Sequence, residues 1–289
     1  MTNTDKAQQG ANLGLPALAL SGPLLLLGCG KMGGALLRGW LKRGIDPAKI
    51  HVVDINPVGL EDVASAGVSI LTQPDALPAD LKPAILLLAI KPQFMDEALP
   101  AYRHFVGPDT LVLSIAAGKT IAYFKRMLGE DVRIVRSMPN TPAAIGRGMT
   151  VICREGNLPA AAFDLCGRLM EAVGEVAFVE SEDLLNPVTA VSGGGPAYVF
   201  LLIECLAEAG RQSGLPADLA MRLARSTVAG AGELARLSPE TPAQLRQAVT
   251  SPKGTTLEAL NILMAEHGMQ KLMIKAIAAA TNRSRELAG

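Results

Sequence analysis

The sequence predicts an α/β fold, with a doubly wound parallel β-sheet in a first domain and an all-helical second domain. Short apolar runs alternate with helical patterns over roughly the first 180 residues, as in a parallel sheet with helices on both faces. Only long helical periodicities follow that point. A chain of 289 residues is long enough for two domains. We expect a flexible segment at 1–20, the sheet domain at 21–180 and the helical domain at 181–289.

The strands of the first domain are expected where the apolar runs occur. Pro23–Cys29 is such a run, typical of a strand buried on both faces. Four further strands are expected at His51–Asp54, Ala84–Ile90, Thr110–Ala116 and Arg133–Ser137. Helical patterns cover Met32–Lys42 and Val58–Ala66. Two more strands, Gly148–Arg154 and Glu175–Val179, are expected at the edge of the sheet.

The second domain is expected to consist of helices alone, because no strand alternation occurs after Ser181. The helical patterns cover 196–213, 216–237, 241–250, 256–266 and 268–287.

The composition bears on the class of protein. The chain has 27 basic residues (Lys and Arg) and 27 acidic residues (Asp and Glu). This balance gives no electrostatic reason to expect nucleic acid or an anionic membrane as a partner. The apolar runs are short, interrupted or charged, whereas a membrane span needs about 20 apolar residues. The four cysteines and three histidines form no metal-ligand spacing, so no metal site is expected. We expect a soluble cytoplasmic protein with reduced thiols.

The strongest local motif follows the first strand and opens the first helix. It fits G-x-G-x-x-G and consists of Gly28, Cys29, Gly30, Lys31, Met32 and Gly33. In this context the glycines permit a tight turn, a close approach to a pyrophosphate and close helix–strand packing. The start of the helix offers unpaired N–H groups to phosphate. The motif therefore predicts a Rossmann domain that binds a nicotinamide dinucleotide, whereas a turn without a ligand would not need three glycines.

Asp54 ends the second strand, about 20 residues after the last glycine. A carboxylate there accepts hydrogen bonds from the ribose hydroxyls of NAD and repels the 2′-phosphate of NADP. No arginine lies in the five positions that follow. The cofactor is therefore expected to be NADH or NADPH, with NADH favoured. The alternative is an exposed acidic residue in a turn.

Three later strands end in segments that are expected to line the same crevice, because the carboxyl ends of parallel strands share one edge. The candidates are Ala89, Ile90, Lys91 and Pro92 after one strand, Ala116 and Ala117 (in SIAAG) after the next, and Asn140 (in MPNTP) after the third. Asn140 is expected against the nicotinamide. Each segment could also be an ordinary strand-to-helix turn.

Two glycine-containing segments precede helices in the second domain. SGGGPAY (192–198) places Pro196 at the first turn of a helix. TSPKGTT (250–256) precedes another helix, and Thr255 with Glu258 fits a capping box. Hydroxyls and glycine at a helix N-terminus suit an anion. From the residues alone, an anion site and a plain capped helix start remain equally supported.

Taken together, these segments resemble the pyrroline-5-carboxylate reductase family. GCGKMG, AIKP, SIAAG, MPNTP, VSGGGPAYVF and VTSPKGTT occur in the order of that family over roughly residues 23–287. The resemblance implies reduction of 1-pyrroline-5-carboxylate to L-proline with NADH or NADPH. It also implies a homodimer formed through the helical domain, with dimers that often assemble into larger rings.

The resemblance further implies that one loop holds the substrate carboxylate and ring nitrogen. The residues concerned are Ser251, Gly254, Thr255 and Thr256, and Thr256 is our candidate catalytic residue. The loop would mainly serve the cofactor of the partner subunit. No side chain has to donate a proton, because a protonated C=N bond is already electrophilic. Catalysis would then consist mostly of orienting the two reactants.

Three residues depart from the usual pattern of the family. Lys253 stands where glycine is common, and lysine would be strained there if the backbone needs a positive φ. Lys31 replaces a neutral polar residue, and Asp54 replaces a small or hydroxyl residue. These departures concern the choice and affinity of the cofactor and not the class of reaction.

Two other functions, a 3-hydroxyacid dehydrogenase and a dinucleotide-binding sensor or scaffold, share parts of this pattern. A 3-hydroxyacid dehydrogenase of similar plan would need a lysine on the first helix of the second domain, where this chain has Val199. A dinucleotide-binding sensor or scaffold would tolerate a degraded substrate loop, yet Ser251, Gly254, Thr255 and Thr256 are all present. Both alternatives are therefore less well supported than a reductase.

Overall fold

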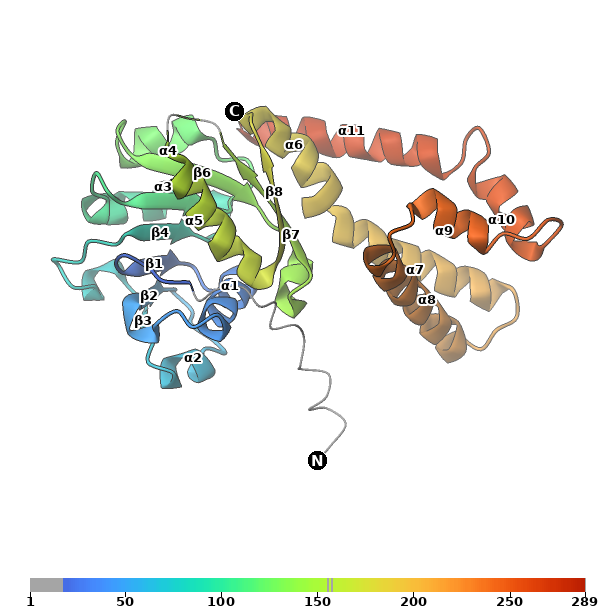
Figure 1. The fold of residues 1–289 in the computed structure, drawn as a ribbon, viewed down its shortest axis with the longest axis horizontal. Helices are drawn as coiled ribbons and strands as arrows, with labels where there is room; N and C mark the ends of the chain where they lie inside the picture. The colour runs from blue at the N-terminus through green and yellow to red at the C-terminus, as the bar shows by residue number, and fades with distance from the viewer. Residues whose placement is uncertain (1–17, 155, 157, 289) are drawn as a thin grey trace. The chain divides into compact units, whose positions relative to one another are not determined.

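The computed structural model describes residues 18–154, 156 and 158–288 and divides the chain into two compact units. Gly194–Ala280 form the helical unit, and the described residues outside that range form the sheet unit (Figure 1). Of the predicted flexible segment 1–20, residues 1–17 lie outside the described residues. Leu18 and Leu20, by contrast, are buried in the core of the sheet unit, because both are apolar and pack beside the first strand and helix.

The sheet unit contains an eight-stranded sheet in the order β3-β2-β1-β4-β5-β6-β7-β8. The strands are β1 (Leu24–Leu27), β2 (Ile50–Val53), β3 (Ser69–Leu71), β4 (Ile85–Leu88), β5 (Leu111–Ser114), β6 (Arg133–Met138), β7 (Gly148–Cys153) and β8 (Gly174–Val179). All neighbouring pairs are parallel except β6 and β7, which are antiparallel. The doubly wound sheet is confirmed, and the two late strands lie at one end of it as predicted. The short strand β3 was not predicted.

Helices cover both faces of the sheet, and each face has its own core. They are α1 (Lys31–Lys42), α2 (Glu61–Ser65), α3 (Met95–Ala98), α4 (Ile121–Leu128) and α5 (Ala160–Met170). Along β1, Leu24 and Leu26 belong to the core with α1 and α5, and Leu25 and Leu27 belong to the core with α3 and α4. This alternation explains why the strand is apolar at every position.

Short 3-10 segments connect many of these elements. They are η1 (Pro47–Lys49), η2 (Pro74–Ala76), η3 (Pro92–Phe94), η4 (Leu99–Phe105), η5 (Thr141–Ile145), η6 (Glu171–Val173) and η7 (Glu182–Leu184). After η7, the sheet unit continues through α6 (Leu185–Val188) and a π-helical turn at Thr189–Gly193.

The helical elements that follow agree closely with the predicted ones. They are α7 (Gly195–Gln212), α8 (Ala217–Leu237), α9 (Pro242–Ala248), α10 (Thr255–Leu263) and α11 (Met269–Ala288). Only the last residues of α11, from Thr281, pack in the sheet unit. Among the described residues, every element after β8 is helical.

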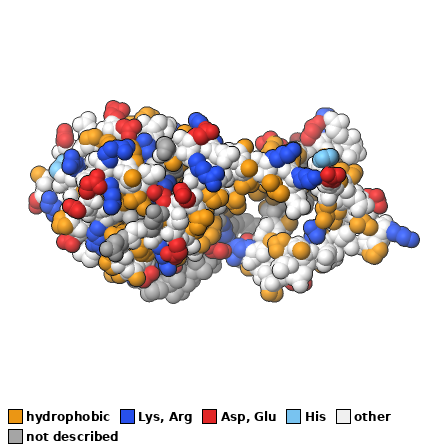
Figure 2. All heavy atoms as spheres, turned by 90° about the horizontal axis from the view of Figure 1, so that it is seen from above, with side chains coloured by type: hydrophobic (Ala, Val, Ile, Leu, Met, Phe, Trp, Pro, Cys, Tyr) orange, Lys and Arg blue, Asp and Glu red, His pale blue; other side chains and the backbone are white. Residues whose placement is uncertain are grey.

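The helical unit has little apolar core within a single chain. Its buried hydrophobic residues, within the described range, are the small side chains of Ala207, Ala220 and Ala224. Large apolar side chains remain exposed along its helices, among them Phe200 (58%) and Ile262 (75%). Figure 2 shows hydrophobic side chains in orange on the surface of these helices. An exposed apolar surface of this kind marks an interaction site.

One helical stretch of the described chain, Glu182–Gln212, could cross a membrane by its length and composition alone. Only 11% of its most apolar window is buried. The same stretch carries charged residues, including Glu204, Glu208 and Arg211. Its exposed apolar surface is part of the surface described above.

Candidate cofactor and substrate sites

The glycine loop joins β1 to α1 with the geometry that a dinucleotide site requires. Gly28 has a φ of +89°, and a Cβ there would lie 2.9 Å from the backbone of Ala89. A Cβ on Gly33 would overlap the carbonyl oxygen of Gly28. Both positions therefore need glycine, for the turn and for the close approach of helix and strand.

The start of α1 is open to an anion. Gly30 is the N-cap residue, no side chain caps the helix, and the first turn carries no acidic residue. A Cβ on Gly30 would meet no atom within 4 Å. The unpaired N–H groups and the positive end of the helix dipole are thus available to a pyrophosphate group, and the residues present fit the predicted cofactor.

Asp54 contacts the glycine loop directly. Its Oδ2 accepts a hydrogen bond from the backbone N–H of Cys29 at 2.5 Å, and its Oδ1 accepts one from the N–H of Asn56 at 2.8 Å. The carboxylate therefore supports the loop as well as lying at the predicted ribose position. Each carboxylate oxygen has a second lone pair that can accept a further hydrogen bond.

Cys29 lies inside this arrangement as a neutral thiol. Burial, reinforced by the negative charge of Asp54, raises the pKa of Cys29 to about 11. The thiol therefore stays protonated near neutral pH and adds no negative charge beside the helix end.

The predicted rim segments all follow carboxyl ends of parallel strands. Ala89, Ile90, Lys91 and Pro92 follow β4, and the N–H of Ala89 donates to the carbonyl of Leu27 at 2.8 Å. Ala116 and Ala117 follow β5, and Ala116 is buried. Because β1, β4 and β5 are adjacent and parallel, their carboxyl ends lie at the same end of the sheet.

The side chain of Asn140 is committed to contacts within the sheet unit. Its amide nitrogen donates to the carbonyl and hydroxyl oxygens of Ser192 at 3.3 and 3.2 Å, and its Oδ1 accepts from the N–H of Met149 at 2.9 Å. Asn140 therefore ties the end of β6 to β7 and to the SGGG turn. Its predicted contact with the nicotinamide stays a prediction.

Arg136 was not singled out from the sequence. Its guanidinium donates to Glu182 at 2.8 Å and to the carbonyl of Ala116 at 3.5 Å. Glu182 also accepts from the N–H of Ile121 at 2.7 Å, at the start of α4. The pair thus links the middle of the SIAAG segment, at Ala116, to the start of α4, at Ile121. The signal in the sequence is an arginine that directly follows two β-branched apolar residues within the strand RIVRSM.

The TSPKGTT loop leads into α10 in the helical unit. Gly254 is the N-cap residue, with extended φ and ψ of −84° and 163° and no side-chain cap. The predicted capping box of Thr255 with Glu258 is therefore wrong. Thr255 is already helical, so the backbone of Gly254 and not a hydroxyl begins the helix. The hydroxyls of Thr255 and Thr256 are consequently not used as caps.

Lys253 adopts a φ of +60°, and it is the one non-glycine residue in the described part of the chain with a positive φ. The positive φ that would strain a lysine is therefore present, because this position has the left-handed backbone conformation that favours glycine. The lysine is accommodated in a strained turn directly before Gly254.

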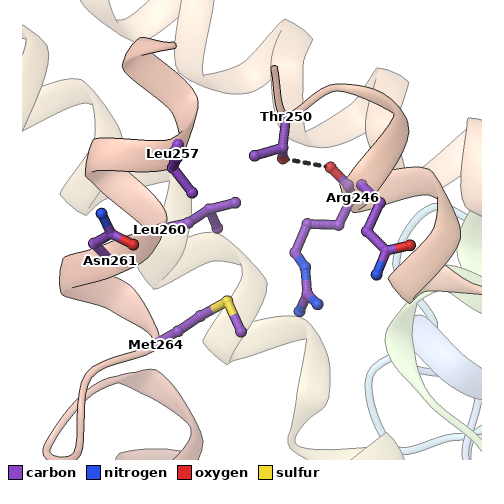
Figure 3. A pocket seen from close by; sticks show the side chains of 7 residues that line it. Arg246, Thr250, Leu257, Leu260, Asn261 and Met264 are labelled. Carbon is purple, nitrogen blue, oxygen red and sulfur yellow. Dashed lines mark hydrogen bonds between the residues drawn. The ribbon is translucent and has the colours of Figure 1, made fainter. Parts of the chain in front are cut away.

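A pocket of about 350 Å³ lies next to this loop, between α9 and α10. Figure 3 shows its lining side chains, with Arg246 and Thr250 on one side and Leu257, Leu260 and Met264 on the other. The hydroxyl of Thr250 donates to the carbonyl of Arg246 at 2.6 Å. None of the four predicted substrate residues lines this pocket. In the described residues, His, Cys, Asp and Glu side chains form no cluster that could hold a metal.

The sheet, the glycine loop and the open helix end define a dinucleotide-binding protein of the oxidoreductase type. Residues 24–118 match the family described as NADP oxidoreductase, coenzyme F420-dependent. Residues 182–287 match the family described as pyrroline-5-carboxylate reductase dimerisation.

Individual proteins give the same result over nearly the whole chain. The pyrroline-5-carboxylate reductase of Pseudomonas aeruginosa is 35% identical over 92% of this chain and 96% of its own length. That of Synechocystis is 41% identical over 74% of this chain and 79% of its own. A solved pyrroline-5-carboxylate reductase from Coxiella burnetii is 34% identical, with a TM-score of 0.84, and covers 93% of this chain and 100% of its own. The chain belongs to the pyrroline-5-carboxylate reductase family.

Proposed function

We propose that this protein reduces 1-pyrroline-5-carboxylate to L-proline with a nicotinamide dinucleotide. One observation carries the proposal: a chain of this family keeps both the open, uncapped helix end after β1 and an intact TSPKGTT loop at the start of α10. The first suits a pyrophosphate and the second suits a small anionic substrate.

The bound dinucleotide would supply the hydride. The backbone of the glycine loop would bind its pyrophosphate, and Asp54 would bind the adenosine ribose. Ser251, Gly254, Thr255 and Thr256 would hold the substrate carboxylate and ring nitrogen. The hydroxyls of the two threonines are free of any capping role, which supports this assignment. These residues would act by fixing the substrate in one orientation, and such positioning can account for a large part of a rate enhancement.

NADH is the proposed preferred form of the cofactor. The support is Asp54, whose carboxylate lies against the glycine loop and would repel a 2′-phosphate. A solved pyrroline carboxylate reductase from Plasmodium falciparum, 27% identical to this chain, has NADP bound. The proposed preference for NADH therefore rests on the residues of this chain.

A homodimer formed through the helical unit is the proposed assembly. The match to a dimerisation family over 182–287 and the exposed apolar side chains on these helices support it. A second copy would cover this surface, including the apolar part of Glu182–Gln212, so that no membrane is required. We propose further that these dimers assemble into a ring and that the protein acts in the cytoplasm. Nucleic acid is not a proposed partner. Sedimentation equilibrium tests it, and a monomer at micromolar concentration would contradict it.

A direct assay tests the reaction. Purified protein should oxidise NADH or NADPH, followed by absorbance, only when 1-pyrroline-5-carboxylate or a close cyclic imino acid is present. A 3-hydroxyacid serves as the control substrate in the reverse direction with the oxidised cofactor. Turnover of the hydroxyacid without turnover of the imino acid would refute the proposal.

A further inference from the structure

Arg38 of α1 is held by a carboxylate of α2 in a two-pronged ion pair. Its Nε donates to Oδ2 of Asp62 at 2.7 Å, and its Nη2 donates to Oδ1 at 2.8 Å. Nη2 also donates to the carbonyl of Gly59 at 2.6 Å, and Nη1 donates to that of Gly34 at 3.5 Å. These contacts engage four of the five N–H donors of the guanidinium.

The guanidinium lies beside the loop that the adenosine ribose would approach. A Cβ built on Gly34 would be 3.1 Å from Nη1 of Arg38 and 4.0 Å from Sγ of Cys29. Cys29 in turn donates its N–H to Asp54. Gly59 lies five residues after Asp54, on the segment that leaves β2. Arg38 is thus a cation close to the glycine loop, in which Cys29 contacts the residue that is predicted to bind the ribose.

An arginine in this neighbourhood is the group that accommodates the 2′-phosphate in dinucleotide sites of this kind. Here its charge is already neutralised by Asp62. The hydrogen bond from Arg38 also lowers the pKa of Asp62 below its ordinary value, so the carboxylate remains ionised at neutral pH. A 2′-phosphate would therefore meet the charges of Asp54 and Asp62 together with a guanidinium whose donors are occupied.

We propose that Asp62 is a specificity-determining residue, which disfavours the 2′-phosphorylated cofactor by neutralising Arg38 and occupying two of its donors. The proposal rests on the proposed cofactor site and deepens it. The side chains of Arg38 and Asp62 are partly exposed, at 40% and 57%, and ion pairs open to solvent contribute little to stability. Arg38 can therefore reorient when its partner is removed, without loss of the fold.

Binding of two nucleotide fragments tests the proposal without any imino acid. Adenosine 2′,5′-bisphosphate carries the distinguishing phosphate, and 5′-AMP lacks it. Isothermal titration calorimetry on the full-length wild type and on Asp62→Ala should show the bisphosphate binding about tenfold more tightly to the variant, because one charge-assisted hydrogen bond is gained. Binding of 5′-AMP should change by less than about twofold, since no contact to its groups is altered.

Two further variants make the result specific. Glu61→Ala removes the same charge from the neighbouring position of α2 and should leave the affinity ratio of the two fragments within about twofold of the wild type. Arg38→Ala combined with Asp62→Ala should lose the gain. An equal gain in Glu61→Ala, no gain in Asp62→Ala, or a gain that survives without Arg38 would overturn the proposal. Because no substrate is turned over, failure of the proposed reaction would appear separately, in the reductase assay.

Discussion

The guanidinium of Arg136, with its side chain 8% exposed, is paired with the carboxylate of Glu182 at 2.8 Å. The two residues are 46 positions apart, on β6 and η7, and Glu182 also accepts the N–H of Ile121. Arg136 also donates to the carbonyl of Ala116 in the SIAAG segment. Breaking a buried pair leaves an uncompensated charge inside the protein.

Glu182→Ala is therefore expected to destabilise the protein by about 3 kcal/mol, measured by urea unfolding. The matched control is Glu286→Ala, which removes an exposed partner of Arg283 with side chains 62% and 66% exposed and should cost less than about 1 kcal/mol. Arg136→Met combined with Glu182→Leu should recover most of the loss. Equal effects of the two single changes would show that the Arg136 pair is in effect solvated.

Thr256→Ala tests the substrate loop. Loss of one hydrogen bond to a charged group costs roughly 1.5–3 kcal/mol, so kcat/KM for the imino acid should fall about tenfold to a hundredfold. The Kd of the dinucleotide should be nearly unchanged. Because Thr256 does not cap α10, the melting temperature should also stay close to that of the wild type. A comparable loss of dinucleotide affinity would place the loop elsewhere.

Asp54→Ser tests the cofactor preference. The wild type is expected to have a higher kcat/KM for NADH than for NADPH. In the variant, the ratio of these two kcat/KM values should fall by about tenfold, or ~1.4 kcal/mol, which narrows or reverses the preference. Asp54 also accepts the N–H groups of Cys29 and Asn56, one on each oxygen. Asp54→Asn is therefore the control that keeps the shape and removes the charge together with one of these two hydrogen bonds, because an amide nitrogen cannot accept. Initial rates with each cofactor at saturating imino acid decide the matter. A clear NADPH preference in the wild type would contradict the assigned role of Asp54.

Lys253→Gly tests the strained turn. A non-glycine residue in the left-handed conformation costs roughly 1–2 kcal/mol, and the greater freedom of glycine in the unfolded chain offsets part of this. The net gain in the free energy of unfolding should be up to about 1 kcal/mol. Lys253→Ala keeps the strain and should bring no gain. Chemical denaturation of both variants checks this, and equal stabilisation by alanine would exclude backbone strain as the cause.

His51 on β2 predicts a dependence of stability on pH. Burial lowers the pKa of this imidazole from its usual 6.5, and its buried Nδ1 has no hydrogen-bond partner among the described residues. Folding therefore favours the neutral ring. The stability is complete above about pH 6.5 and falls as the pH drops below it, because the unfolded chain takes up a proton first. The wild type should thus lose more stability between pH 7.5 and 5.5 than His51→Gln, as thermal unfolding at both pH values would show. Parallel curves would mean that His51 is solvated.

Features that depend on local pattern could be predicted from the amino-acid sequence alone. The doubly wound sheet, the helical second half and the position of the glycine loop follow from periodicity and from residues close together in the chain. The roles of Gly28 and Gly33 could be predicted because both residues belong to one short turn between a strand and a helix. The sequence likewise indicated that Lys253 would be strained if its φ were positive, and its φ is positive.

The contacts between side chains that are distant in the sequence, by contrast, depend on the folded arrangement of the elements. Asp54 was correctly located at the end of β2, but its hydrogen bond to the amide of Cys29 joins residues 25 positions apart. The hydrogen bond from the amide of Asn140 to Ser192 joins residues 52 positions apart, while the predicted contact of Asn140 with the nicotinamide stays a prediction. The partnership of Arg38 with Asp62 likewise depends on how α1 and α2 pack. Such pairings are set by the packing of whole elements, and a periodicity records only which face of an element is buried.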